Sequence, residues 1–219
     1  MHPLVLPRLY PILDAGLLLR GGLSIEGFAR ELREAGVRFL QYRDKEAPDA
    51  VLLERAAMLR RIFPPCDSCL ILNDRVSLLL SSGYDGLHVG QEDLPPAAAR
   101  ALVGPDVLIG VSTHGEPQLL SAGNGPADYV AIGPVFATIS KAVPDPVVGL
   151  EGVRVARALT TKPLVAIGGI SRSNCAAVLA AGADSVAVIS DLIPRHGDSV
   201  GKVVEEFFFL LGDHSQTLS

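Results

Sequence analysis

The feature that most restricts the fold of this chain is a regular alternation of short apolar segments with longer amphipathic segments. The apolar segments are rich in Val, Ile and Leu and show no clean period-two pattern, as expected of parallel strands that are covered on both faces. The alternation occurs about eight times, which is the number of units in a (β/α)8 barrel. We therefore predict an α/β fold with a single (β/α)8 TIM barrel.

The expected elements follow one another without a linker or a shift in composition, so residues 1–219 are predicted to form one domain. Strands are expected at residues 8–14, 39–43, 69–74, 86–89, 108–112, 129–133 with an extension to 136, 163–167 and 185–189. Helices are expected at residues 24–36 and 48–62, in a short segment ending at 83, and at 94–103, 117–122, 150–159, 173–181 and 200–211. The alternative is a doubly wound open sheet, which rarely needs eight strands in so short a chain.

The charge and the hydropathy exclude two classes of partner. The net charge of −5 argues against a nucleic-acid surface, so an anionic ligand would have to meet local positive charge. The mean hydropathy is +0.35, but no apolar run approaches the roughly 20 residues that span a bilayer. No signal-peptide pattern is present, and we expect a cytoplasmic protein. The sequence does not decide between a monomer and a homodimer.

The three cysteines are interpreted as residues without a metal or redox role. Their odd number gives no disulfide framework. Cys66 and Cys69 match the pattern C-x-x-C, but a zinc site would need a second pair of ligands. Cys69 is also expected to begin a buried strand, which leaves it poorly placed for redox chemistry.

Two aspartates mark the ends of neighbouring expected strands, Asp74 after the third and Asp93 after the fourth. Parallel neighbours would bring both carboxylates to the carboxyl-terminal edge, where ligand sites of such sheets form. Close carboxylates repel unless a cation or a proton lies between them. Mg²⁺ suits this pair, because it is held by one or two carboxylates together with substrate phosphates. The alternative is that each aspartate caps the helix that follows it.

Cationic side chains are expected at the same edge. Gln41, Arg43 and Lys45 alternate along the second strand and its exit, so all three lie on one side. An arginine fork and a lysine point charge suit an anionic group such as a phosphate. Alternatively, these cations form ion pairs with Asp44 or Glu46 at a solvated strand end.

The remaining polar clusters follow the later strands. Ser112 could bond a phosphate or an amine, and His114 could act as an acid–base group or as a neutral hydrogen-bonding residue. Residues 133–141 offer hydroxyls, backbone amides and one lysine, which is typical of a binding loop. Gly168 and Gly169 end the seventh strand and Ser190 follows the eighth, the usual phosphate position in this barrel, with a helix start adding a favourable dipole.

This layout predicts two phosphorylated substrates, one of them carrying a diphosphate. The second substrate is expected to displace that metal-bound diphosphate group. The residues then resemble the thiamine phosphate synthase family over nearly the whole chain. The motifs that carry the resemblance are QYRDK at 41–45, ILNDR at 71–75, GQED at 90–93, GPVF at 133–136 with TISK at 138–141, and IGGI at 167–170.

The resemblance implies a transferase that joins 4-amino-2-methyl-5-(diphosphooxymethyl)pyrimidine to a thiazole phosphate, or its carboxylated form, giving thiamine phosphate and pyrophosphate. It implies that Mg²⁺ is held by Asp74 and Asp93. It assigns the pyrimidine diphosphate to Gln41, Arg43, Lys45, Asn73, Ser112 and Lys141, with Arg43, Ser112 and Lys141 as the catalytic residues. It assigns the thiazole phosphate to Thr138, Ile139, Ser140, Gly169, Ile189 and Ser190.

The chain departs from the family pattern at Ala137, where Pro is expected, and at Ser140, where Thr is usual. Two other functions stay open. The related thiazole tautomerase would use a histidine after the fifth strand, the place of His114, but its reaction needs no metal and would leave the acidic pair without a purpose. A non-catalytic protein that binds phosphorylated ligands would show affinity without turnover.

Overall fold

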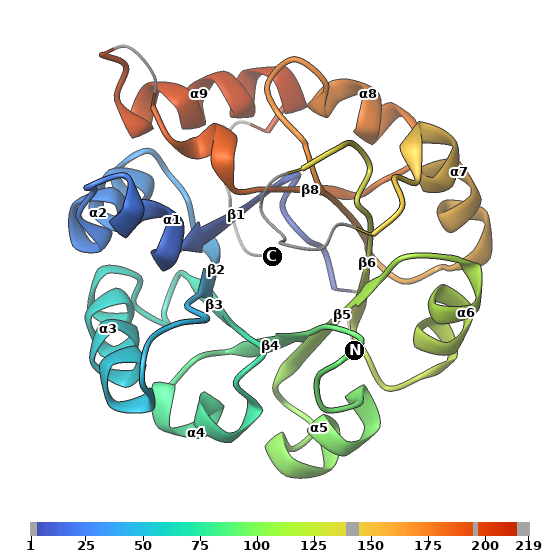
Figure 1. Cartoon of the computed structure of the whole chain (residues 1–219), viewed down its shortest axis with the longest axis horizontal. Coiled ribbons are helices and arrows are strands. Elements are labelled where there is room, and N and C mark those ends of the chain that lie inside the picture. The colour runs from blue at the N-terminus through green and yellow to red at the C-terminus, as the bar shows by residue number, and fades with distance from the viewer. Residues whose placement is uncertain (1–3, 139–144, 195–196, 214–219) are drawn as a thin grey trace.

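The structure is a computed structural model that describes residues 4–138, 145–194 and 197–213. Ile139, Ser140 and Lys141 therefore lie outside the described residues. Eight parallel strands close into a barrel in chain order, with β1 paired to both β2 and β8 (Figure 1). The predicted (β/α)8 TIM barrel is confirmed.

The barrel is made of short strands separated by helices. The strands are β1 (Leu9–Asp14), β2 (Phe39–Arg43), β3 (Cys69–Asn73), β4 (Gly86–Val89), β5 (Leu108–Thr113), β6 (Tyr129–Ile132), β7 (Leu164–Ile167) and β8 (Ser185–Val188). The α-helices are α1 (Ala15–Arg20), α2 (Ile25–Glu34), α3 (Asp49–Ile62), α4 (Leu79–Ser82), α5 (Pro96–Val103), α6 (Glu116–Asn124), α7 (Gly149–Leu159), α8 (Cys175–Ala180) and α9 (Val200–Leu211). The described residues also form two 3₁₀ turns, Val76–Leu78 and Ser190–Leu192.

Two segments differ from the expected elements. The sixth strand ends at Ile132 and does not run on to Phe136, because Pro134 has no N–H for the strand ladder. Helix α1 was not expected, since its apolar residues show no helical spacing. It begins because the Asp14 carboxylate accepts a hydrogen bond from Leu17 N at 2.8 Å.

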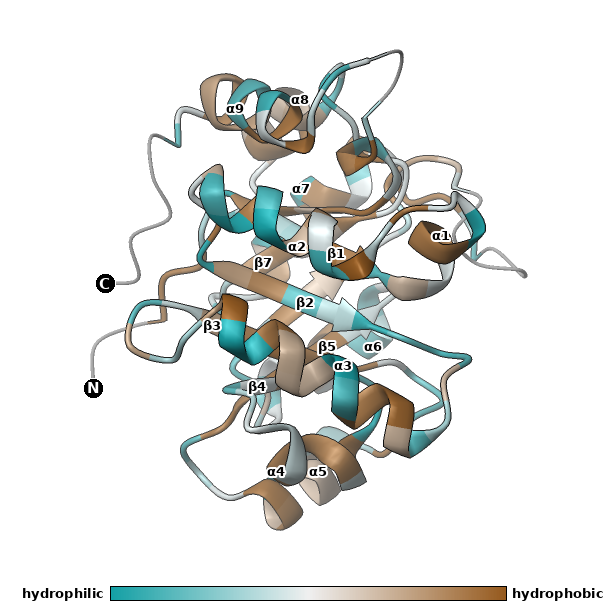
Figure 2. Cartoon of the chain, turned by 90° about the vertical axis from the view of Figure 1, so that its left-hand side faces the viewer, coloured by the Kyte–Doolittle hydropathy of each residue, from teal (hydrophilic) through white to brown (hydrophobic). Residues whose placement is uncertain are grey.

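Alternate residues of each strand face two separate cores. Outward residues such as Leu40 and Leu72 pack between the barrel and the helices. Inward residues such as Tyr10, Ile71 and Tyr129 fill the barrel itself. Figure 2 shows β2 passing from brown to teal toward its arrowhead, so this strand becomes hydrophilic at its carboxyl-terminal end. No helix within the described ranges is both long and apolar enough to span a bilayer.

The amino-terminal end of the barrel is fastened by a repeated aspartate–arginine arrangement. Asp128, just before β6, accepts hydrogen bonds from Ile109 N at 2.7 Å and from Arg100 of α5 at 2.6 Å. Each acceptor thus ties a helix and two strands together. The same arrangement joins Asp85 to Leu70 N and Arg60, and Asp184 to Leu164 N and Arg157.

Candidate active site

A cavity of about 470 Å³ opens at the carboxyl-terminal end of the strands. Its size is in the range of small-molecule sites. It brings together every described residue that the sequence analysis assigned to substrates or metal: Gln41, Arg43, Lys45, Asn73, Asp74, Asp93, Ser112, Thr138, Gly169, Ile189 and Ser190. Their individual roles remain predictions.

The acidic pair lies where β3 and β4 end. Asp74 has a φ of 62°, a left-handed conformation that is uncommon outside glycine and asparagine. Burial, followed by hydrogen bonding to and repulsion from Asp93, raises the pKa of the Asp74 carboxyl to about 6. Lys45 Nζ lies 3.6 Å from Asp74 and offsets only part of this effect. Two full negative charges on Asp74 and Asp93 are therefore unfavourable unless a cation lies between them.

The alternative reading of these aspartates as helix caps is wrong. Neither the 3₁₀ turn after Asp74 nor α5 after Asp93 has a side-chain cap hydrogen bond. Asp93 instead accepts from Gly90 N at 2.7 Å, which bends the chain back on itself and aims the carboxylate at the cavity.

Arg43 is held by a residue that the sequence analysis assigned no role. Asp14 lies opposite Arg43 in the pairing of β1 with β2, and its carboxylate is hydrogen-bonded to the guanidinium. The other carboxylate oxygen of Asp14 caps α1. Asp14 is 7% exposed, so the helix cap fixes the carboxylate and the carboxylate fixes Arg43.

Arg43 and Lys45 do not form ion pairs with Asp44 or Glu46, which was the alternative interpretation of these cations. Asp44 pairs with Arg55 at 2.7 Å. Burial alone would raise the pKa of the Asp44 carboxyl, but its hydrogen bonds with Tyr42, Arg55 and Ala47 N outweigh that effect and lower the pKa. Glu46 pairs with Arg20 at 3.4 Å. Arg43 and Lys45 therefore face the cavity and its aspartates.

A chain of polar side chains crosses the inside of the barrel beneath the cavity. Gln41 Nε2 donates to the Tyr10 hydroxyl at 2.8 Å, which lies 2.8 Å from the Tyr129 hydroxyl. His88 Nδ1 is 3.1 Å from Tyr129, and His88 Nε2 is 2.8 Å from Ser112 Oγ. Burial lowers the pKa of the His88 imidazole to about 4, so the ring is neutral at pH 7.

Three members of this hydrogen-bonded network, Tyr10, His88 and Tyr129, were not identified from the sequence. Period-two spacing back from Gly90 would have placed His88 inside the barrel. A histidine within a buried parallel strand was the available signal, since such strands are otherwise apolar.

The side of the cavity formed by β7 and β8 presents backbone and small residues. Gly168 and Gly169 have φ values of 101° and 63°, which favour glycine. A Cβ at Gly169 would lie 2.5 Å from Ala137 O, so only glycine fits between these loops. The expected helix dipole is not next to Gly169, because α8 starts only at Cys175, while Asn174 Nδ2 donates to Gly169 O at 3.0 Å.

His114 lies at the β5 side of the cavity. Its Nδ1 is 2.6 Å from Gly133 O, and a carbonyl only accepts, so Nδ1 carries a proton. Its Nε2 is 3.6 Å from Asp145. These contacts are those of a hydrogen-bonding residue that joins the loops after β5 and β6.

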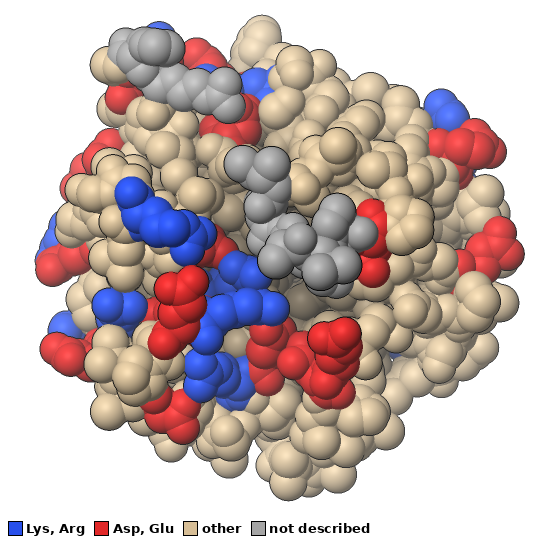
Figure 3. All heavy atoms as spheres, in the orientation of Figure 1, with Lys and Arg blue, Asp and Glu red and all other residues tan. Residues whose placement is uncertain are grey.

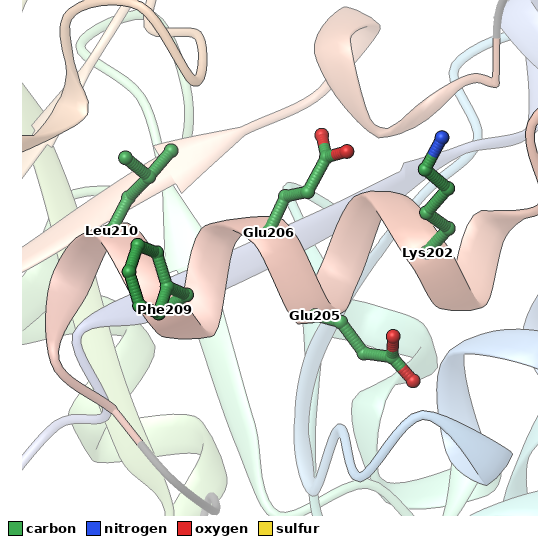
Figure 4. Close-up of a pocket in the computed structure, with 5 residues that line it drawn as sticks. All are labelled: Lys202, Glu205, Glu206, Phe209 and Leu210. Carbon is green, nitrogen blue, oxygen red and sulfur yellow. The ribbon is translucent and has the colours of Figure 1, made fainter.

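Charge is unevenly distributed around the cavity. In Figure 3, most charged side chains next to the central hollow lie on its left and lower sides, over β1–β4, and the visible opposite side is mostly uncharged. A second hollow of about 480 Å³ lies outside the barrel on α9 (Figure 4). It is lined by Lys202, Glu205, Glu206, Phe209 and Leu210. Glu206 forms an ion pair with Arg172, and Lys202 forms one with Asp198. The candidate site is therefore the cavity at the carboxyl-terminal end of the strands.

Comparison with known proteins agrees with this geometry. Residues 9–192 match the family model described as thiamine monophosphate synthase. The chain belongs to this family. It is 52% identical over 192 residues to the thiamine-phosphate synthase of Koribacter versatilis, covering 87% of this chain and 90% of that protein. It is 41% identical to the Chloroflexus aurantiacus thiamine-phosphate synthase, covering 85% of each.

A solved structure shares both the fold and the family resemblance. The thiamine phosphate pyrophosphorylase from Pyrococcus furiosus superimposes with a TM-score of 0.82 and 33% identity. The match covers 94% of this chain and 96% of that one. Family membership, fold and cavity position therefore point to one activity.

Proposed function

We propose that this protein is a thiamine-phosphate synthase, a transferase that joins hydroxymethylpyrimidine diphosphate to a thiazole phosphate and releases pyrophosphate. The observation that carries the proposal is the placement of the acidic pair Asp74 and Asp93 beside Arg43 and Lys45 in one cavity. Acidic and basic groups side by side suit a diphosphate bound with a divalent cation.

The residues present fit Mg²⁺. The two carboxylates match an ion that takes one or two protein carboxylates and completes its shell with water and phosphate. The described residues contain no cluster of three or more His, Cys, Asp or Glu side chains, so they support a shared metal–phosphate site and not an all-protein cage. When bound, Mg²⁺ would neutralise charge on the diphosphate.

The reaction breaks one C–O bond and forms one C–N bond. The proposed displacement is dissociative: the C–O bond to the diphosphate breaks first, and its electrons leave with pyrophosphate. The thiazole nitrogen then captures the resulting pyrimidine-methyl cation and forms the new C–N bond with its lone pair. No proton is transferred in this step. Arg43 and Lys45 stabilise the departing anion, and Asn73 and Gln41 orient the pyrimidine diphosphate.

The thiazole phosphate is proposed to lie on the other side of the cavity. Thr138, Gly169, Ile189 and Ser190 would hold it, through hydroxyls and closely approaching backbone. Lys141, Ile139 and Ser140 keep the roles that the family resemblance implies. We also propose a cytoplasmic location, which fits this chemistry of soluble phosphorylated substrates.

The test is incubation of the purified protein with both substrates and Mg²⁺, followed by mass detection of thiamine phosphate and pyrophosphate. We expect equal amounts of both products and no turnover after removal of Mg²⁺ by a chelator. Conversion of the thiazole phosphate alone would indicate the tautomerase instead. Binding of both substrates without any product would indicate the non-catalytic protein.

A further inference from the structure

The polar chain inside the barrel is more elaborate than packing requires. Barrel interiors are usually filled by branched apolar residues in layers. Here Tyr10, Tyr129 and His88 occupy that space, and a Cβ at Gly110 would lie 2.0 Å from the Tyr129 ring. Glycine at position 110 thus leaves the space that the Tyr129 ring occupies. A buried polar network lowers stability unless every member is hydrogen-bonded, so we expect this hydrogen-bonded network to have a function.

The direction of the hydrogen bonds follows from counting protons. Within the described residues, the Tyr10 hydroxyl contacts the Gln41 amide and the Tyr129 hydroxyl. The amide N–H₂ of Gln41 only donates, so the Tyr10 proton has one acceptor, the oxygen of Tyr129. The Tyr129 proton must then go to His88 Nδ1, which lies 3.1 Å away.

The tautomer of His88 is set by this sequence. Because Nδ1 accepts from Tyr129, the proton of the neutral ring is on Nε2. The Nε2–H group donates to Ser112 Oγ at 2.8 Å. Ser112 lines the cavity, and because Oγ accepts from His88, its own hydroxyl proton can be donated into the cavity.

We propose that His88 is a positioning residue, held as its Nε2–H tautomer by a one-directional hydrogen-bond chain from Gln41, that orients the Ser112 hydroxyl as a donor into the cavity. The inference rests on the proposed function for its substrate. A donated proton needs an acceptor, and we assign the Ser112 hydroxyl proton to a diphosphate oxygen of the pyrimidine substrate. Gln41, which lines the same cavity, thereby couples its own orientation to that of Ser112.

The first experiment does not depend on any activity. In protein labelled with ¹⁵N-histidine, long-range ¹H–¹⁵N correlation spectra report which ring nitrogen carries the proton. His88 is assigned by the signals lost in His88→Gln. We expect the Nε2–H form in the ligand-free protein at pH 7. Detection of the Nδ1–H form would mean that the chain runs the other way and would overturn the proposal.

Matched tyrosine variants test the origin of this tautomer. Tyr129→Phe removes the donor to His88, and we expect a mixture of both tautomers. Tyr84→Phe is the control, because it removes another buried phenol whose hydroxyl is 3.5 Å from Ala56 O, outside the barrel interior. It should leave the His88 signals unchanged. An unchanged His88 tautomer in Tyr129→Phe would contradict the proposed chain.

The second experiment measures the effect on catalysis. His88→Leu should lower kcat about tenfold, the effect of one lost hydrogen bond, with little change in the KM of the pyrimidine diphosphate. His88→Gln places an amide donor near the Nε2 position and should recover most of this loss. In a Ser112→Ala background, His88→Leu should have no further effect, because His88 acts through Ser112.

The outcomes separate the two proposals. If the unmodified protein makes no thiamine phosphate, the proposed function fails, and the histidine spectra still decide the hydrogen-bond chain. If it is active but the effects of His88→Leu and Ser112→Ala multiply, His88 acts elsewhere and the positioning role is wrong while the function stands.

Discussion

Three aspartates at the amino-terminal end of the barrel and two at the carboxyl-terminal end are held in opposite ways. At the amino-terminal end, Asp85, Asp128 and Asp184 each accept from an arginine and a backbone N–H. At the carboxyl-terminal end, Asp74 and Asp93 lie against each other, and burial raises the pKa of Asp74 to about 6. The first three have their charges satisfied within the protein, as do Asp14 and Asp44 at the other end, whereas the charges of Asp74 and Asp93 oppose each other, as a proposed Mg²⁺ site requires. We therefore expect changes at the first three aspartates to affect folding and changes at the acidic pair to affect activity.

The largest effect is expected from Asp93→Asn at the carboxyl-terminal end. The amide keeps an acceptor for Gly90 N but removes the charge, so kcat/KM should fall about 1,000-fold while folding is retained. Steady-state kinetics with varied Mg²⁺ measure this, with Glu151→Gln on the outer face of α7 as a control for loss of a surface carboxylate. Near-normal turnover would remove Asp93 from the metal site.

The matching change at the amino-terminal end is Asp128→Ala. It removes the hydrogen bonds from Arg100 and Ile109 N and should lower the free energy of unfolding by about 2–3 kcal/mol. Urea denaturation measures this loss. The folded fraction should keep kcat/KM within about twofold, because no group at the cavity changes. A large fall in kcat/KM of fully folded protein would show that the two ends are not separate.

Asp74→Asn should stabilise the ligand-free protein, a gain on the order of 1–3 kcal/mol at pH 7. The folded-state pKa of Asp74, about 6, lies above its ordinary value of 3.8, so ionisation opposes folding. The wild type should therefore lose stability relative to the variant as the pH rises from about 4 to about 6. Melting temperatures of both proteins across this range, without metal, measure the difference. Equal pH profiles would mean that the acidic pair is not strained.

The eight strands could be predicted because each is a short apolar run, and period-two spacing correctly placed Gln41 and Arg43 on one side. The roles of Asp14 and His88 could not, because they depend on contacts between strands. Asp14 meets Arg43 only through the register of β1 and β2. His88 meets Tyr129 across the barrel interior, a contact that appears only when the sheet closes and that needs the space at Gly110.

The smallest effect is expected from Ser185→Ala inside the amino-terminal end. Ser185 is fully buried, and its hydroxyl has no hydrogen-bond partner within the described residues. Removing the hydroxyl should change the unfolding free energy by less than about 1 kcal/mol, toward higher stability. A clear loss in the same urea assay would show that this end also contains a polar group with an unseen partner.

Diffraction at the manganese absorption edge, from crystals soaked in Mn²⁺ and pyrophosphate, tests most directly the proposal that Asp74 and Asp93 hold a divalent cation. Our account predicts an anomalous peak between the Asp74 and Asp93 carboxylates, at coordination distances of about 2.1 Å, with pyrophosphate reaching Arg43. Pyrophosphate bound in the cavity without a metal peak beside these two carboxylates would contradict it.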